Sequence, residues 1–347
     1  MNTQLMIETH GDPLGAIQRF TMNLWEEFNL DAMVVSQYQT LTPGTEVPTF
    51  LINQPGKLEE INPFKPLMTT NTAKMIPELM KASPQSKLGL LLRPCESRAL
   101  SEMITRGVID QDRLIIISID CLGTYPADEH QWRSLRKGSS EALTRESIQF
   151  ARVGGIAAYR FRSACQRCIS PKAYRGDINI GVIGLPVRQH ILIEISEERI
   201  SEVSRLIPYT NGLANQSQVF ERERCIDRIT GRNQNTHERI IQNLFDILPK
   251  HVTELIHQFK NCGSCQICLE NCPICAIDYP RRRKDGSYVR ADITRWILSC
   301  AGCGMCEQSC PNRLPLSVIF RHLKQQLDES RQIILNEVPE EHLSPFH

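Results

Sequence analysis

The sequence lacks an excess of either charge, because its 347 residues include 40 lysines and arginines against 39 aspartates and glutamates. With no global field to draw it toward nucleic acid or an anionic membrane, we expect neither partner. The sequence also lacks a basic segment followed by an apolar one at its start. Its apolar runs, such as 114–119, are too short to cross a bilayer. These absences predict a cytoplasmic protein without a membrane span.

Nucleotide-binding fingerprints are missing as well. The sequence has neither GxGxxG nor a P-loop, which removes the usual sequence support for a Rossmann dinucleotide site or for nucleotide hydrolysis.

Cysteine is abundant but unevenly placed. Of the fourteen cysteines, none precedes Cys95 and nine lie between Cys262 and Cys310. A disulfide framework is typical of small secreted chains, whereas clustering in a long chain without a signal peptide favours metal binding.

Two segments of this region share one spacing, C-x2-C-x2-C-x3-C-P, which is typical of bacterial ferredoxins. In two-cluster ferredoxins the fourth cysteine of each run ligates the other cluster. The spacing therefore predicts two 4Fe-4S clusters. The first would be held by Cys262, Cys265, Cys268 and Cys310, and the second by Cys272, Cys300, Cys303 and Cys306.

Structural zinc sites are the alternative for these cysteines. Zinc modules usually combine separated C-x2-C pairs or include histidine, and no histidine lies between Cys262 and Cys310. Cys275 is expected to be a spare buried thiol, and Cys225 an inert one. The basic run 281–284 is either a solvated turn or a docking site for an acidic partner.

Branched apolar runs at 32–35, 88–92, 114–119 and 191–195 predict buried strands, with helices at 15–28 and 73–81 between some of them. This alternation predicts an α/β domain with a mostly parallel sheet over residues 1–250. A mainly helical two-cluster ferredoxin module is expected at 251–330, entered by helices over 236–260 with a break at Pro249. The apolar stripe after Pro315 predicts a closing helix, followed by a tail at 331–347.

The remaining cysteines lie in segments that resemble one family. These segments are 92–100 (LRPCESRAL), 118–123 (SIDCLG), the C-x2-C pair 165–168 and the glycine-containing run 177–184. Their order resembles that of the β subunits of coenzyme F-420-dependent hydrogenases and formate dehydrogenases. The formate dehydrogenase subunit is the more similar, since it also ends in two ferredoxin motifs, the second followed by a segment like Leu314-Pro315-Leu316-Ser317.

The resemblance implies FAD, iron-sulfur clusters and hydride exchange with the deazaflavin coenzyme. It also implies a partner subunit that carries the dehydrogenase or hydrogenase site. The family usually has paired glycines near the N-terminus, whereas this chain has Gly11-Asp12-Pro13-Leu14-Gly15. Because aspartate and proline replace a permissive glycine pair, we expect the isolated chain to hold FAD weakly or not at all.

Four residues of the resembling segments are candidates for cofactor binding. Gly181 and Gly184 either face a flavin or only make turns. Arg93 and Arg98 either neutralise cluster or cofactor charge or form surface ion pairs.

Cys95 and Cys121 follow predicted strands and should emerge at the carboxyl edge of a parallel sheet, where open α/β sheets place ligands. With the pair Cys165 and Cys168, they form a complete ligand set for a third 4Fe-4S cluster. The alternative is that the first two are buried thiols and the pair binds zinc or nothing.

The sequence thus predicts an iron-sulfur electron-transfer subunit of a cytosolic oxidoreductase complex, linking a flavin or deazaflavin site to a partner. The alternative is a flavin-free relay and docking subunit in a heterodisulfide-reductase-like complex, and a zinc-stabilised binding protein is a third interpretation. The residues that select the terminal donor or acceptor would lie in another chain.

Overall fold

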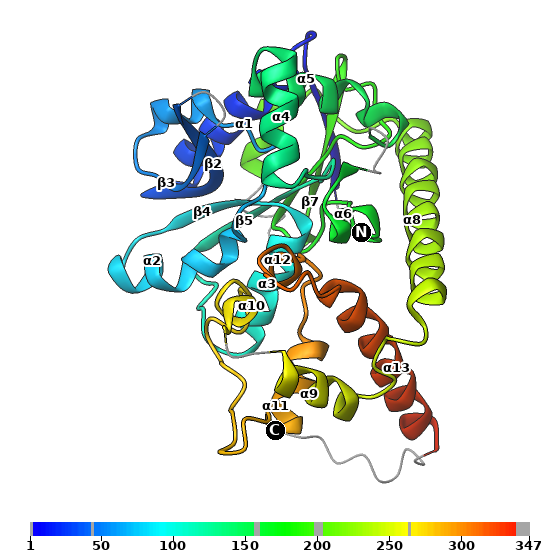
Figure 1. Cartoon of the computed structure of the whole chain (residues 1–347). Coiled ribbons are helices and arrows are strands. Elements are labelled where there is room, and N and C mark those ends of the chain that lie inside the picture. Colours follow the sequence, from blue (N-terminus) through cyan, green and yellow to red (C-terminus); the bar gives the residue numbers. More distant parts are fainter. Residues whose placement is uncertain (1–2, 43–44, 156–159, 198–203, 263–264, 338–347) are drawn as a thin grey trace.

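The computed structural model describes residues 3–42, 45–155, 160–197, 204–262 and 265–337. An α/β part forms the upper half of the view in Figure 1, and a mainly helical part forms the lower half. No helix in these ranges is both long and apolar enough to cross a membrane.

The α/β part is built on a seven-stranded sheet of order β1-β7-β6-β5-β4-β2-β3. Its centre is parallel, as expected, because β2, β4, β5 and β6 run in one direction. Both edges are antiparallel: β3 pairs with β2, and β7 pairs with β6 and β1. The strand bounds are Thr3–Glu8 (β1), Ala32–Thr42 (β2), Thr45–Ile52 (β3), Leu88–Leu92 (β4), Leu114–Ile119 (β5), Ile178–Gly181 (β6) and His190–Ile195 (β7).

The helices of this part form where apolar residues recur at helical spacing. In α1, Ile17, Phe20 and Leu24 are almost fully buried, which follows the predicted stripe. The predicted helix at 73–81 is a 3-10 turn followed by a short α-helix. The bounds are Pro13–Phe28 (α1), Pro55–Glu60 (η1), Thr72–Met75 (η2), Ile76–Ala82 (α2), Pro94–Thr105 (α3), Ala127–Lys137 (α4), Ser140–Gln149 (α5), Ala151–Val153 (η3), Ser163–Gln166 (α6) and Ser204–Tyr209 (η6).

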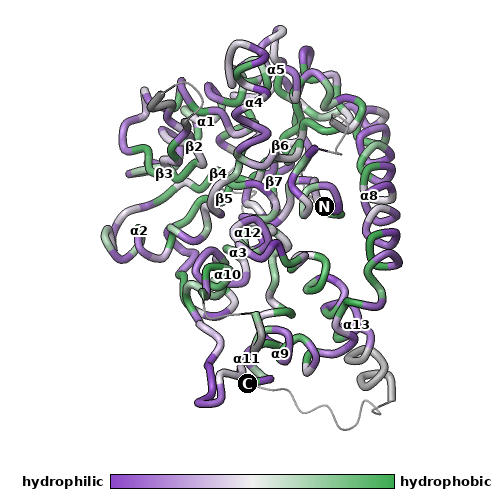
Figure 2. The backbone as a smooth tube through the Cα atoms, viewed as in Figure 1, coloured by the Kyte–Doolittle hydropathy of each residue, from purple (hydrophilic) through white to green (hydrophobic). Residues whose placement is uncertain are grey.

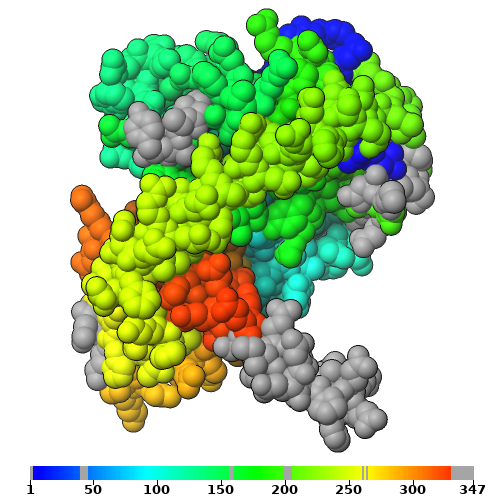
Figure 3. Space-filling model, turned by 90° about the vertical axis from the view of Figure 1, so that its right-hand side faces the viewer, coloured from blue at the N-terminus to red at the C-terminus, as the bar shows by residue number. Residues whose placement is uncertain are grey.

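Helix α8, Gln216–Leu244, connects the two parts. It begins twenty residues before the helical pattern expected from 236, and it ends before Pro249. Figure 3 shows α8 running along one face of the molecule with α13 beside its lower end. The chain therefore has one continuous helix across the boundary between its two parts.

The lower part consists of short helices around an aromatic centre. Trp296 stacks on Phe259 at a centroid distance of 5.9 Å and meets Phe320 edge-on at 4.6 Å. The stripe that starts at Leu316 is buried, as predicted for the closing helix. The basic run 281–284 forms an exposed hydrophilic turn that protrudes from this part (Figure 2). The bounds are Val252–Asn261 (α9), Ile267–Glu270 (α10), Arg290–Leu298 (α11), Met305–Gln308 (α12) and Leu316–Glu337 (α13).

Candidate metal centres

Four cysteines from three segments of the α/β part line one cavity. Cys95 lies in the first turn of α3, directly after β4, and Cys121 follows β5. The parallel pairing of β4 with β5 brings both to the carboxyl edge of the sheet, as the sequence predicts. Cys165 and Cys168 lie in and just after α6. All four line this one cavity, together with Arg162 and Asn233.

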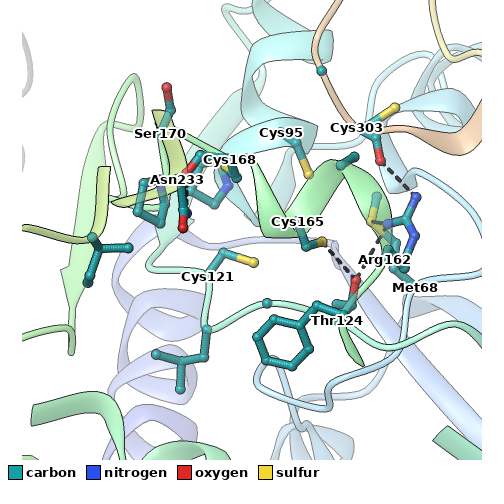
Figure 4. A pocket seen from close by; sticks show the side chains of 18 of the residues that line it. Met68, Cys95, Cys121, Thr124, Arg162, Cys165, Cys168, Ser170, Asn233 and Cys303 are labelled. Carbon is teal, nitrogen blue, oxygen red and sulfur yellow. Dashed lines mark hydrogen bonds between the residues drawn. The ribbon is translucent and has the colours of Figure 1, made fainter. Parts of the chain in front are cut away.

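The sulfur atoms of Cys95, Cys121 and Cys165 point into the same space (Figure 4). Burial raises the pKa of the Cys121 thiol to about 12, and Cys165 and Cys168 add to the rise, whereas Arg93 opposes it. Burial likewise raises the pKa of Cys95 well above its ordinary value. Thiols in such surroundings need a cation to become thiolates, which is what a metal ligand set requires.

Asp120 fixes the residues around Cys121, and the sequence analysis gave it no role. Its carboxylate accepts hydrogen bonds from Ala173 N, Val182 N and Ile183 N, each at 2.8 Å. It also accepts hydrogen bonds from both terminal nitrogens of Arg222 of α8, at 2.6 and 3.0 Å. This ion pair is fully buried. The sequence could have pointed to Asp120, because this aspartate stands between a predicted strand and a candidate ligand. No signal in the sequence pointed to its partner Arg222, which lies 102 residues later.

Arg93 is buried and forms no surface ion pair. Its guanidinium donates to Leu67 O at 3.0 Å and to Lys65 O at 2.8 Å, while its backbone N–H donates to the Glu96 carboxylate at 2.8 Å. Burial disfavours the charged guanidinium, but Glu96 and Cys121 raise the pKa of Arg93. It is therefore a fixed positive charge beside the four-cysteine cavity.

Arg98 reaches from α3 into the lower part of the molecule. Its Nε donates to Ala301 O at 2.9 Å, within the second ferredoxin-type run, and its Nη1 lies 3.4 Å from Ser170 O. Burial disfavours its charge, yet Cys168 and Cys95 raise its pKa. Arg98 thus lies between two groups of candidate ligands.

Gly181 and Gly184 are explained by the packing of α8. A Cβ atom on Gly181 would lie 2.8 Å from Arg222 Cζ, and one on Gly184 would lie 2.8 Å from Arg222 Cα. Gly184 also has a φ of +78°, which side chains rarely adopt. Both glycines make room for the helix that supplies the buried arginine.

In each of the two predicted sets of the ferredoxin-type runs, cysteines lie near enough to shift the pKa of one another. Burial, together with Cys262, Cys265 and Cys310, raises the pKa of Cys268 to about 12. In the other set, burial together with Cys300, Cys272 and Cys303 raises the pKa of Cys306 well above its ordinary value. A cluster held by three cysteines of one run and the fourth of the other would use these neighbours. Cys265 is exposed, and Gly263 and Ser264 lie outside the described residues.

Cys275 is 1% exposed and contacts Cys272, in line with the expected buried thiol. Hydrogen bonds from Cys275 and from Trp296 Nε1, the latter at 3.3 Å, lower the pKa of Cys272 to about 6. These donors favour a thiolate at the position expected to ligate the second cluster. Cys225 is buried in α8 and does not line the cavity.

Within the described ranges, no three Cys, His, Asp or Glu side chains converge closely enough to hold a single metal ion. The four thiolates of a cubane bind four different iron atoms, so such ligands surround a space rather than one point. Gathered thiols, a cavity and buried arginines therefore fit a cluster better than a mononuclear zinc site.

The second cluster set adjoins the four-cysteine cavity, which the sequence analysis did not predict. Cys303 and the neighbouring Gly302 line this cavity with Cys95 and Cys121. The cavity cysteines and the set that contains Cys303 are therefore neighbours, whereas Cys265 of the other set is exposed.

The N-terminal segment that departs from the family pattern is a closed helix cap. Asp12 precedes α1 and its Oδ1 accepts from Gly15 N at 3.0 Å, while Pro13 starts the helix. A Cβ atom on Gly15 would lie only 1.9 Å from Asp12 Oδ2. The glycine is therefore needed for the cap, and the cap uses a backbone donor that could otherwise face a phosphate.

No family model matches the chain. The F420-dependent formate dehydrogenase subunit beta of Methanocaldococcus jannaschii is 22% identical over 88% of this chain and 88% of that protein. A chain from the F420-reducing [NiFe] hydrogenase complex of Methanosarcina barkeri, in a xenon-derivatised structure, superposes with a TM-score of 0.49 and 13% identity. That match covers 68% of this chain and 91% of the hydrogenase chain. The sequence relative confirms the resemblance drawn from the motifs.

Proposed function

We propose that this chain is the iron-sulfur electron-transfer subunit of a cytoplasmic oxidoreductase complex. The observation that carries the proposal is that Cys303 of the second ferredoxin-type run lines the same cavity as the four cysteines of the α/β part. When bound, 4Fe-4S clusters supply one-electron chemistry. The fourteen free thiols suit the reducing cytoplasm.

In this proposal the protein's own residues hold, separate and insulate the carriers. Cys95, Cys121, Cys165 and Cys168 would hold the innermost cluster, and the cavity walls would exclude water from it. The exposure of Cys265 supports a position nearest to a partner subunit for the group of Cys262, Cys265, Cys268 and Cys310. By analogy with the relative, the partner would carry a formate dehydrogenase or hydrogenase site, and electrons would enter or leave through a deazaflavin or flavin.

The flavin-free relay is favoured by one observation, the Asp12 cap. Because the α1 N-terminus is closed by its own carboxylate, the chain offers no open glycine pair there for a flavin phosphate. In this alternative the α/β part is a docking scaffold, as in a heterodisulfide-reductase-like assembly.

Iron analysis of the anaerobically purified chain tests the cluster set. We expect about twelve iron and twelve acid-labile sulfide atoms per chain, and a broad visible absorption that dithionite bleaches. Cys303→Ser and Cys121→Ser should each lower the iron content by about four atoms. Cys225→Ala is the matched control, since this buried thiol lies outside the cavity lining, and it should retain all the iron. Stoichiometric zinc without sulfide would refute the proposal.

A further inference from the structure

Arg162 is a buried guanidinium surrounded by neutral acceptors. It is 4% exposed, and its Nη2 donates to Cys303 O at 2.7 Å and to Met305 Sδ at 3.3 Å. Its Nη1 lies 3.2 Å from Met68 Sδ and 3.5 Å from Thr124 Oγ1, and its Nε has no partner among the described residues. A buried charge without a counter-charge is costly, so this position calls for an anionic neighbour.

The anionic neighbours available to Arg162 are the cysteine groups themselves. Its side chain lines the four-cysteine cavity and also contacts the loop that carries Cys303 (Figure 4). Gly304, with a φ of +67°, brings this loop close, because a Cβ atom there would lie 2.4 Å from Ala164 Cβ. Arg162 therefore lies between the loop that carries Cys303 and the four cysteines of the cavity.

We propose that Arg162 stabilises the reduced state of the cluster held by Cys272, Cys300, Cys303 and Cys306, while its hydrogen bond positions the Cys303 loop. Each added electron makes a thiolate-ligated cluster more negative, so a desolvated cation beside it favours reduction. This inference rests on the proposed cluster-binding function.

An EPR-monitored redox titration of the anaerobically purified chain tests the inference. In Arg162→Gln we expect one cluster signal to have about one tenth of the wild-type ratio of reduced to oxidised form at the same potential, a lowering of about 59 mV. Arg162→Lys keeps the charge and should recover most of this loss. Iron content and the thermal unfolding midpoint are recorded for every variant.

Arg106 provides a matched control. It directly follows α3 and also reaches the lower part, donating to Ser299 Oγ at 2.7 Å, but it is already paired with Glu102 and Asp278 at 2.9 and 3.3 Å. Arg106→Gln should leave all midpoints unchanged. An unshifted midpoint in iron-replete Arg162→Gln, or an equal shift in Arg106→Gln, would overturn the inference.

A second pair of variants decides the case if Arg162→Gln loses its iron. Met68→Glu keeps the guanidinium but gives it a carboxylate partner, and Met68→Gln is its neutral counterpart. We expect Met68→Glu alone to lower the midpoint, and equal midpoints would overturn the inference. An iron-free wild-type chain would instead refute the proposed function, and the inference with it. An iron-replete chain with unmoved midpoints would refute the inference alone.

Discussion

Asp120 receives five hydrogen bonds, from the loop at Ala173, from the backbone after β6 and from Arg222 of α8. These bonds converge on the residue directly before Cys121. Both charges of the Asp120–Arg222 pair are completely buried. Removing one charge leaves the other without a partner in a low-dielectric site, which is more damaging than losing the pair as a whole.

Asp120→Asn should therefore lower the free energy of unfolding by about 3 to 5 kcal/mol. Urea unfolding followed by circular dichroism measures this loss. The control is Asp278→Asn, because Asp278 is about half exposed in its pairs with Arg106 and Arg295, and such pairs contribute about 1 kcal/mol or less. Equal losses of unfolding free energy in the two variants would show that the buried Asp120–Arg222 pair contributes no more than an exposed pair.

At the scale of elements, the contact between α8 and α13 encloses a histidine. His237 of α8 is fully buried. Burial and the nearby guanidinium groups of Arg321 and Arg167 lower its pKa from 6.5 to about 4. The folded protein therefore keeps this imidazole neutral at a pH where the unfolded chain has already protonated it.

Because the folded pKa is depressed, the contribution of His237 is present above about pH 6.5 and is lost as the pH falls toward 4. Between about pH 7.5 and 5.5, this linkage should remove about 1.4 kcal/mol of unfolding free energy. Over the same pH interval, the His237→Leu variant should lose about 1.4 kcal/mol less unfolding free energy than the wild-type protein. Urea unfolding at both pH values checks the difference, and identical pH slopes in the two proteins would contradict the assignment.

At the scale of the whole molecule, the carboxyl edge of the sheet faces the helical part. Arg98 of α3 and Arg106, which directly follows α3, both reach across this boundary, and α8 covers it along one side (Figures 1 and 3). The cavity at the boundary is lined by cysteines of both parts. The carboxyl edge of the sheet, where open α/β sheets bind ligands, therefore carries cysteine thiols in this protein.

The same architecture predicts a low flavin content. Gly181 at the end of β6 and Gly184 after it pack on α8, and Asp12 closes the N-terminus of α1, so neither position offers an open backbone cradle. Acid extraction of the anaerobically purified chain should release well under one FAD per chain. Extraction of a sample with added FAD controls for recovery. One FAD per chain would contradict this expectation and favour the hydride-splitting role.

The sequence alone predicted the features that depend on local pattern. The strands at 88–92 and 114–119 have the bounds expected from their apolar runs, and the helix beginning at Leu316 follows its stripe. Spacing alone predicted two ligand sets among the eight cysteines near the C-terminus, because three cysteines at three-residue intervals define one loop. The antiparallel edges and the early start of α8 were not predicted, because they depend on which distant segments pair.

Tertiary structure decided which charges and glycines serve the candidate site. Arg222 meets Asp120 across 102 residues, and Arg162 meets the Cys303 loop across 141. Gly181 proved to accommodate Arg222, although the run around it suggested a flavin contact. The physical reason is that residue type and spacing specify what a segment can bind. Burial and charge compensation, however, arise only when segments far apart in sequence pack together.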